Sequence, residues 1–204
     1  MSDQGIGLTP AEQNQLIYLL GRLQQPWPRE VYNAFASIIC FTAIEVALLR
    51  MHEGRLQILL TERTGDEFYA GKFHSPGSML RATDVVKTDG LDPSACTYEN
   101  AIKRVLVQDL GFPEMMVEED WTMYFNSLPL AIPGFPYNTP RGPENCLLII
   151  GELAEVPAQG AYVDIEKVLN NPVDFFMIPH NLLVIRRAKW AFNLLYQLRN
   201  IEGW

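Results

Sequence analysis

The chain has 204 residues, 48% of them hydrophobic and 20% charged, and its formal net charge is −8 at pH 7. This composition is typical of a folded globular protein with a sizeable core and excludes a disordered chain. The acidic balance argues against nucleic acid or an anionic membrane as a partner, because both need a basic face. A local basic patch could still form at Arg186, Arg187 and Lys189.

The sequence gives several indications of compartment. Residues 1–4 show no basic-then-apolar signal pattern, and the most apolar run, residues 36–49, is short and contains Glu45. The three cysteines, Cys40, Cys96 and Cys146, have no CxxC spacing and an odd count. We therefore expect a cytoplasmic protein with free thiols and no membrane-spanning helix.

An N-terminal helix is predicted from residue 10. Thr9 can cap it, Pro10 suits its first position, and Glu12 completes a capping box. An apolar stripe follows, which predicts that the helix packs on the main domain; it consists of Leu16, Leu19, Leu20 and Leu23. Residues 1–36 are accordingly predicted to be a helical extension, and residues 37–204 the main domain.

Two strands are predicted next, over residues 41–51 and 55–61, joined as a hairpin. In the first strand Ile44, Val46 and Leu48 point one way, and Glu45 and Ala47 the other. A loop with a short strand around Phe73 covers residues 65–78, and the polar residues 82–96 are predicted to be an inserted loop.

In the second half of the sequence, a helix is predicted over residues 98–110, with Thr97 as its N-cap and Gly111 as its end. Strands are predicted over residues 121–132 and 145–153, with a loop rich in Pro and Gly over 133–143 between them. A last helix spans about residues 180–199, and its buried face is formed by Val184, Ala188, Ala191, Leu195 and Leu198. This order suggests a mixed sheet covered by helices.

Two segments together resemble the Nudix superfamily. Residues 71–78, GKFHSPGS, are similar to that family's G-x-W-x-x-P-G-G lead-in. Residues 101–112, AIKRVLVQDLGF, are similar to the helical half of the Nudix box, A-x-x-R-E-(apolar)-x-E-E-x-G-(apolar). The resemblance covers roughly residues 38–198, and the order of the flanking elements fits it.

The resemblance implies an α/β/α sandwich. It also implies, for an active member, hydrolysis of a nucleoside diphosphate linked to another group, with Mg²⁺ or Mn²⁺ held by the Glu residues of the box. Residues at i, i+3 and i+4 share one helix face, where carboxylates can gather hard cations that bind pyrophosphate and activate water.

The box is degenerate at its chemical positions. The three acidic positions hold Val105, Gln108 and Asp109, so only Asp109 is a carboxylate and a candidate metal ligand; otherwise it is a solvated residue at the helix end. In the loop half, Ser78 stands where the box begins with Gly, and Asp84 is the nearest match to the expected Glu. The positions that serve the fold remain, namely Gly77, Arg104 and Gly111, with Pro76, Ala101, Leu106 and Phe112.

Other side chains leave alternatives open. An acid in or just after the insertion could rebuild a site, or these acids could be surface residues; they are Asp84, Asp89, Asp92 and Glu99. Glu152 or Glu155 could be a distant general base or a surface acid. His74 could contact a phosphate or base, and His180 could lie near a helix start. Trp121, Tyr124 and Phe125 are predicted core aromatics, whereas Phe135 and Tyr137, in the predicted loop, are the better candidates for stacking on a nucleobase.

Three functions follow from these patterns. The first is a Nudix-like protein that lacks efficient pyrophosphohydrolase activity and binds a nucleotide-like ligand or a protein. The second is a divergent metal-dependent hydrolase whose ligands include Asp109 and an acid from residues 84–99 or 152–155. The third is a non-catalytic interaction module, for example a homodimer formed through the N-terminal helix.

Overall fold

The computed structural model describes residues 8–23, 27–36, 41–63, 69–81, 84, 93–127, 129–140 and 142–202. The described strands are β1 Phe41–His52, β2 Arg55–Glu62, β3 Phe73–His74, β4 Gly77–Met79, β5 Leu130–Thr139, β6 Gly142–Gly151 and β7 Ala161–Asp164. The α-helices are α1 Pro10–Arg22, α2 Arg29–Ala36, α3 Pro93–Arg104, α4 Glu114–Asp120, α5 Ile165–Asn170 and α6 Asn181–Glu202. A π-helix (Val105–Asp109) continues α3, and a 3₁₀ helix (Trp121–Tyr124) follows α4.

The strands form one mixed sheet around β1. Its main path runs β3-β2-β1-β6-β5 within the described residues, with β4 paired to β1 and β7 paired to β2. β1 is antiparallel to β2 and β4 but parallel to β6, so the predicted mixed sheet and the predicted 41–61 hairpin are confirmed.

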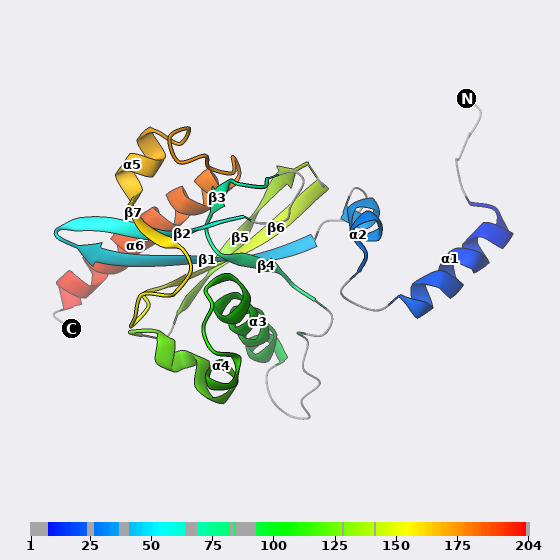
Figure 1. Cartoon of the computed structure of the whole chain (residues 1–204), viewed down its shortest axis with the longest axis horizontal. Helices are drawn as coiled ribbons and strands as arrows, with labels where there is room; N and C mark the ends of the chain where they lie inside the picture. Colours follow the sequence, from blue (N-terminus) through cyan, green and yellow to red (C-terminus); the bar gives the residue numbers. More distant parts are fainter. Residues whose placement is uncertain are drawn as a thin grey trace.

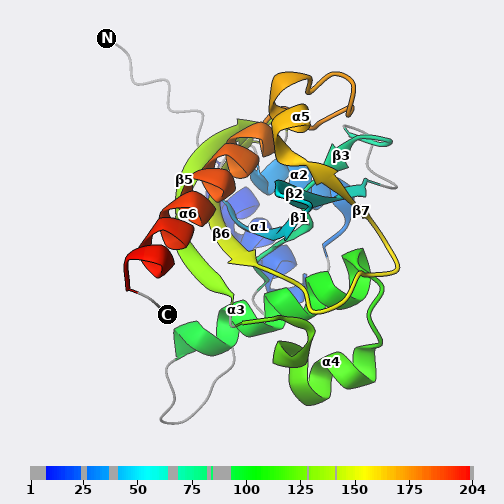
Figure 2. The same cartoon turned by 90° about the vertical axis from the view of Figure 1, so that its left-hand side faces the viewer.

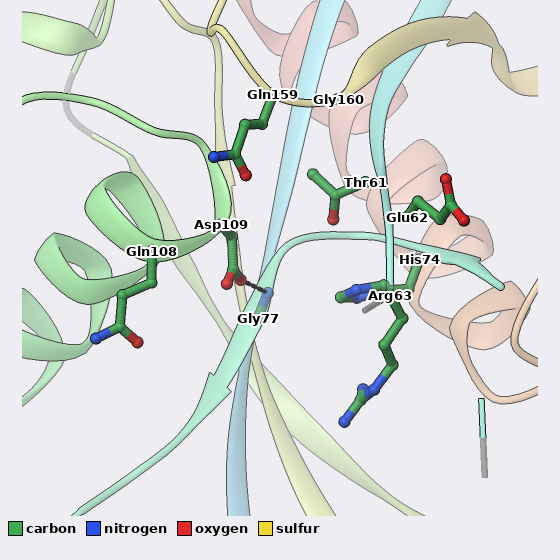
Figure 3. Close-up of a pocket in the computed structure, with 9 residues that line it drawn as sticks. All are labelled: Thr61, Glu62, Arg63, His74, Gly77, Gln108, Asp109, Gln159 and Gly160. Atoms are coloured by element: carbon green, nitrogen blue, oxygen red, sulfur yellow. Dashed lines mark hydrogen bonds between the residues drawn. The ribbon is translucent and has the colours of Figure 1, made fainter. Parts of the chain in front are cut away.

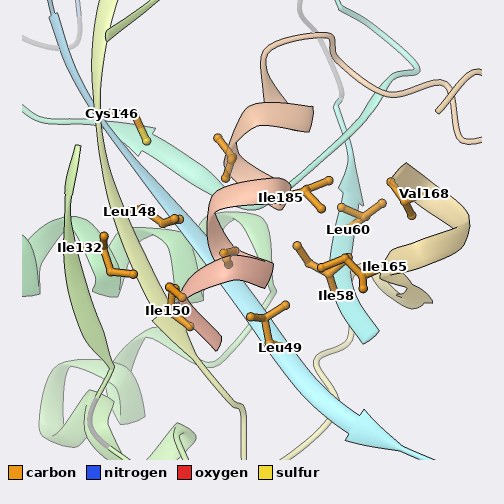
Figure 4. Close-up of a cluster of buried hydrophobic side chains, with 14 of the residues drawn as sticks. Leu49, Ile58, Leu60, Ile132, Cys146, Leu148, Ile150, Ile165, Val168 and Ile185 are labelled. Atoms are coloured by element: carbon orange, nitrogen blue, oxygen red, sulfur yellow. The ribbon is translucent and has the colours of Figure 1, made fainter. Parts of the chain in front are cut away.

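Helices cover both faces of the sheet (Figures 1 and 2). On one face α5 and α6 pack on a buried cluster that includes Ala47, Leu49 and Ile185 (Figure 4). On the other face α3, the π-helix and α4 pack on a cluster that includes Ile44, Val46 and Leu48. The alternation predicted for β1 is therefore confirmed, and so is the α/β/α sandwich.

The N-terminal helix forms with the predicted capping box, since Thr9 and Glu12 exchange hydrogen bonds. Its predicted packing on the domain is wrong, because no residue of α1 is buried and its apolar stripe is exposed. Figure 1 shows α1 lying apart from the sheet. A second short helix, α2, instead lies close to the start of β1, where the Tyr32 ring stacks on Phe41 at 5.2 Å.

Two predicted elements of the second half are wrong. Residues 121–124 form a 3₁₀ helix, because the Asp120 side chain caps it through the Thr122 N–H, and β5 begins only at Leu130. The predicted loop 133–143 is mostly strand, since β5 continues to Thr139 and pairs with β6 across a register shift between Ile132 and Phe135. β5 is the last strand of the sheet's main path, a place where a proline's missing N–H costs no ladder bond.

The helix predicted over residues 98–110 begins earlier, at Pro93, so Thr97 lies inside α3 rather than at its start. The predicted insertion therefore ends by residue 92, and most of it lies outside the described residues. Gly111 does end the helical segment, with φ of 75°. Cys146 is a buried free thiol. Among the described residues, no helix is long and apolar enough to cross a membrane.

Candidate functional site

The site is organised around Gly77, which lies on β4 rather than in the predicted loop. Gly77 is paired with Glu45 of β1, and the N–H of Val46 donates to the Pro76 carbonyl at 2.8 Å. A Cβ at residue 77 would stand 2.8 Å from the Ile44 carbonyl oxygen and 2.9 Å from Glu45 Oε2. Glycine is therefore required by close approach of the two strands.

The box helix divides its three acidic positions between core and surface. Val105 is buried in the cluster beneath α3, whereas Gln108 is exposed and Asp109 half-buried. The segment is a π-helix, in which Leu110 N–H bonds the Val105 carbonyl five residues back. The three positions do not form one shared site, because Val105 packs into the core whereas Gln108 and Asp109 line the cleft described below.

Asp109 contacts the Gly77 strand directly. Its Oδ2 accepts a hydrogen bond from the Gly77 N–H at 3.1 Å (Figure 3). Burial raises the pKa of this carboxyl to about 6, although the Gly77 hydrogen bond, Arg63 and Arg104 oppose the rise. Asp109 thus joins the two halves of the box, and one of its lone pairs is already engaged by the backbone.

Arg104 holds the loop half of the box in place. Its guanidinium is paired through both terminal nitrogens with the Asp84 carboxylate, and it also donates to Ser78 Oγ at 3.3 Å and to the Met79 carbonyl at 3.0 Å. Asp84 is 2% exposed, so the expectation of a polar surface residue is wrong here. The structure assigns Ser78, Asp84 and Arg104 to the scaffold.

A cleft of 390 Å³ opens beside this scaffold and is hereafter called the box cleft. Its lining side chains, shown in Figure 3, come from the end of β2, from β3 and β4, from the π-helix and from the segment before β7; they are Thr61, Glu62, Arg63, His74, Gln108, Asp109 and Gln159, with Gly77 and Gly160. The cleft therefore combines two carboxylates, one arginine, one histidine and two amides.

A buried carboxyl lies under the same strand. Glu45 is 8% exposed; its Oε2 accepts a hydrogen bond from Ser75 Oγ at 2.9 Å, and the Ser75 N–H donates to Asn181 Oδ1 at 2.6 Å. Burial raises the pKa of Glu45 to about 8, and Glu144 and Asp109 add to the rise while Ser75 and Arg63 oppose it. Sequence analysis placed Glu45 on the face of β1 opposite Ile44 but did not predict that the carboxyl is buried and bonded by Ser75. The available signal was a lone acid in an apolar run.

The other candidate acids do not converge on the cleft. Glu99 is paired with Lys103 at 3.1 Å, and Glu152 and Glu155 do not line the cleft. Asp89 and Asp92 lie outside the described residues. Within the part of the chain that the structure describes, no group of three or more His, Cys, Asp or Glu residues could hold a metal ion.

The histidines and loop aromatics separate into two places. His74 lines the box cleft, and its Nδ1 lies 2.6 Å from the Ser75 carbonyl oxygen. His180, near the start of α6 as predicted, is buried and stacks on Tyr137 at 4.8 Å. The proposal that Phe135 and Tyr137 stack on a nucleobase from a loop is wrong in its premise, because both lie on β5 and Tyr137 is buried.

The residues at the box do not fit a cation held by three helix carboxylates. Val105 offers no ligand atom and is buried, Gln108 offers a neutral oxygen, and Asp109 already accepts from the Gly77 N–H. The pKa of Asp109, raised to about 6, also weakens its hold on a cation in mild acid, since a ligand must be deprotonated.

Comparison with known proteins gives a fold similarity only. No family model and no curated protein matches the chain. The Nudix domain of Shewanella oneidensis NrtR, solved with ADP ribose, is 14% identical, with 91% of this chain and 99% of that chain covered and a TM-score of 0.47.

Two further solved structures are of the same kind. The Nudix hydrolase RenU of M. smegmatis is 17% identical, with coverage of 76% and 87% and a TM-score of 0.46. The C. elegans Ap4A hydrolase is 10% identical, with coverage of 76% and 98% and a TM-score of 0.44. At these values the comparisons carry no argument about ligand or activity; in architecture, the chain is similar to Nudix domains.

Proposed function

We propose that this chain is a Nudix-superfamily protein whose degenerate box lacks efficient pyrophosphohydrolase activity and whose cleft binds a nucleotide-like ligand. One observation carries the proposal. The cleft and the scaffold of the box are formed, but of its three acidic positions one is buried valine, one is neutral glutamine and one is an aspartate engaged by the Gly77 N–H.

The lining of the box cleft supports a polar, anionic ligand. Arg63 and His74 offer positive or donor groups, and the amides of Gln108 and Gln159 offer neutral hydrogen-bond donors and acceptors. Arginine matches phosphate geometry through its planar fork of donors. The volume of 390 Å³ lies within the range of about 300–1,000 Å³ of small-molecule sites.

Calorimetric titration of the full chain tests the binding half of the proposal. ADP, ADP-ribose and a dinucleoside polyphosphate serve as probes, with and without Mg²⁺. Arg63→Gln should weaken binding at least about 10-fold, because a charge-assisted hydrogen bond is worth about 1.5–3 kcal/mol. Arg55→Gln, at the start of β2 and outside the cleft, is the matched control. Absence of binding by every probe to the wild type would remove the proposal.

Turnover assays test the catalytic half. Wild-type protein and Asp109→Asn are incubated with Mg²⁺ or Mn²⁺ and a panel of nucleotide sugars, dinucleotides and nucleoside triphosphates. We expect no turnover above the no-protein blank for either. Efficient metal-dependent turnover by the wild type, abolished in Asp109→Asn, would contradict the proposed loss of activity.

The divergent hydrolase remains the second candidate because Glu62 and Asp109 line the same cleft. Mg²⁺ is often held by only one or two protein carboxylates together with substrate phosphates. This candidate predicts that Glu62→Gln and Asp109→Asn each abolish a turnover that the wild type shows; the turnover assay decides between it and the first candidate.

An interaction role is the third candidate, and the exposed apolar stripe of α1 favours it. Leu16 and Leu19 are 42% and 52% exposed, and an isolated helix of 13 residues is only marginally stable in water. A homodimer formed through α1 predicts a sedimentation coefficient that falls when Leu16 and Leu19 are both changed to Gln. A wild-type chain that sediments as a monomer at all concentrations would remove the homodimer.

A further inference from the structure

A mainly apolar groove lies between β5 and the first half of α6 and is hereafter called the α6 groove. It has a volume of 430 Å³, and the residues that line it are Phe135, Leu183, Arg186, Arg187 and Trp190. None of them lines the box cleft, so the groove is a separate surface. Figure 2 shows α6 lying over the sheet beside β5, which is the last strand of the sheet's main path.

α6 has one apolar face in the core and a second apolar face in solvent. Val184 and Ala188 belong to the first face and are buried against the sheet. Leu183, Trp190 and Leu194 follow one another at intervals of seven and four residues, which places them on one side of the helix. They are 46%, 53% and 43% exposed, so this second face is uncovered in the single chain.

α1 is the other helix with an uncovered apolar face. Leu16, Leu19 and Leu20 lie three and four residues apart on one side of α1, and they are 42%, 52% and 39% exposed. No residue of α1 is buried, and a lone helix of 13 residues is only marginally stable in water. An apolar surface that covers these leucines would therefore stabilise α1 as a helix.

The charges on these two faces are opposite in sign. Glu12 lies four residues before Leu16 and so shares the apolar face of α1, whereas Arg22 lies six residues after Leu16 on the other side of the helix. The α6 groove presents Arg186 and Arg187, and both side chains are exposed. A carboxylate on one face and two guanidinium groups on the other favour contact between them and fix its orientation.

We propose that the α6 groove receives α1 of a second copy of this chain, while the groove of the second copy receives α1 of the first. The structure holds α1 apart from its own domain (Figure 1), so the occupant is assigned to another chain. Such an exchange makes the two contacts identical and closes the pair, so assembly stops at a dimer. The inference goes beyond nucleotide binding and gives the interaction role a defined receiving surface.

The two faces can be changed without disturbing the fold of the single chain. Trp190, Leu16 and Leu19 are all exposed there, and surface substitutions change stability little. Mass action also confines any stabilisation by the dimer to concentrations above its dissociation constant, so unfolding of a dilute sample reports the single chain. Self-association and folding can therefore be measured separately.

Sedimentation of the full chain from about 1 μM to about 1 mM tests for the dimer, because weak interfaces dissociate in this range. We expect a concentration-dependent change from monomer to dimer. Trp190→Ala should weaken it at least about 10-fold, since truncating a tryptophan in an interface is among the costliest changes. Leu16→Gln combined with Leu19→Gln should weaken it similarly. Met115→Gln is the control, because Met115 is 82% exposed on α4, outside both faces.

Mixing the two defective proteins tests the exchange itself. Trp190→Ala keeps an intact α1, and the leucine double variant keeps an intact α6 groove. An equimolar mixture should therefore associate more tightly than either variant alone at the same total concentration, because one α1 still meets one groove. The mixed dimer has only one of the two contacts, so it should remain weaker than the wild-type dimer. Far-ultraviolet circular dichroism establishes that each variant is folded.

Other modes of association give other results. A wild type that stays monomeric at every concentration would overturn the proposal. A dimer that Trp190→Ala leaves intact would overturn it by showing that α1 pairs with α1, and a dimer that survives the leucine changes would show pairing of groove with groove. A mixture no tighter than its components would also contradict the exchange. None of these changes touches the box cleft, so calorimetry with nucleotides decides the proposed function independently.

Discussion

At the scale of single residues, the buried position of Val105 predicts that a carboxyl there is costly. Its side chain is 1% exposed and packs among Ile44, Leu106 and Val117. We expect Val105→Glu to lower the free energy of unfolding by at least about 3 kcal/mol, because a buried carboxyl without a partner is costly. Urea unfolding followed by circular dichroism measures the change.

Gln108→Glu is the control for this substitution. Gln108 is exposed on the same π-helix and lines the box cleft, so a carboxylate there stays in water. Its free energy of unfolding should change by no more than about 0.5 kcal/mol. Equal stability of the Val105→Glu and Gln108→Glu proteins would contradict the buried position of Val105.

Glu45 predicts how stability depends on pH. Burial raises the pKa of its carboxyl from an ordinary 4.5 to about 8 in the folded chain, so over this interval the folded state holds the proton and the unfolded state does not. Stability that is fully present below pH 4.5 is therefore lost as the pH rises toward 8, at up to about 1.4 kcal/mol per pH unit for one proton.

Glu45→Gln tests this dependence because it keeps an acceptor for Ser75 but cannot ionise. We expect the slope of unfolding free energy against pH to become flatter between pH 6 and 8. Asp109→Asn, whose parent carboxyl has a pKa of about 6, should change the slope only below that pH. The same slope in wild type and Glu45→Gln would show that Glu45 does not titrate in this window.

At the scale of elements, the Asp84–Arg104 pair fastens the segment after β4 to the end of α3. Asp84 is 2% exposed, so removing either partner leaves a buried, uncompensated charge. We expect Asp84→Ala and Arg104→Met each to destabilise the chain by about 3–5 kcal/mol. The double variant should lose clearly less than the sum of the two, as measured in a double-mutant cycle by chemical denaturation. Strict additivity would mean that the two side chains do not act as a pair.

The elements differ in how well local pattern predicted them. The buried faces of β1 and α6 were predictable, because period-two and 3.6-residue repeats of apolar side chains are set by packing alone. Most of β5, residues 133–139, was missed because its prolines indicate a loop, and only the place of β5 at the end of the sheet's main path makes a proline such as Pro136 tolerable. The position of a strand within the sheet depends on tertiary structure, which no local sequence pattern encodes.

The candidate site shows the same limit. Motif spacing identified Gly77, Arg104, Asp109 and Gly111, all of which the structure places at or beside the box. It could not reveal that Val105 is buried in the core while Asp109 lines the cleft, since that depends on how the helix packs. Arg63, Gln159 and Glu45 lie far from the box in sequence, and only the folding of the sheet brings them to it.

At the scale of the whole molecule, the N-terminal extension has two unlike parts. α1 buries no residue, while Trp27 and Tyr32, from the segment that follows, contact Phe41 at the start of β1. Figure 1 shows the same division, with α2 beside the domain and α1 apart from it. The extension predicted as one unit from its sequence is thus a free helix followed by a segment that contributes to the domain.

Deletion of residues 1–23 separates these parts. Because α1 buries nothing, the shortened chain should keep its free energy of unfolding within about 0.5 kcal/mol and its nucleotide affinity within the error of calorimetry. Deletion of residues 1–36 also removes Trp27 and Tyr32, which contact Phe41, and should lower the free energy of unfolding by more than about 1 kcal/mol. A large loss of stability on removing residues 1–23 would mean that α1 packs on the domain in solution. If the sedimentation coefficient instead drops while stability is unchanged, α1 is a surface for self-association. That role would explain its exposed leucines, which make no buried contact in the monomer.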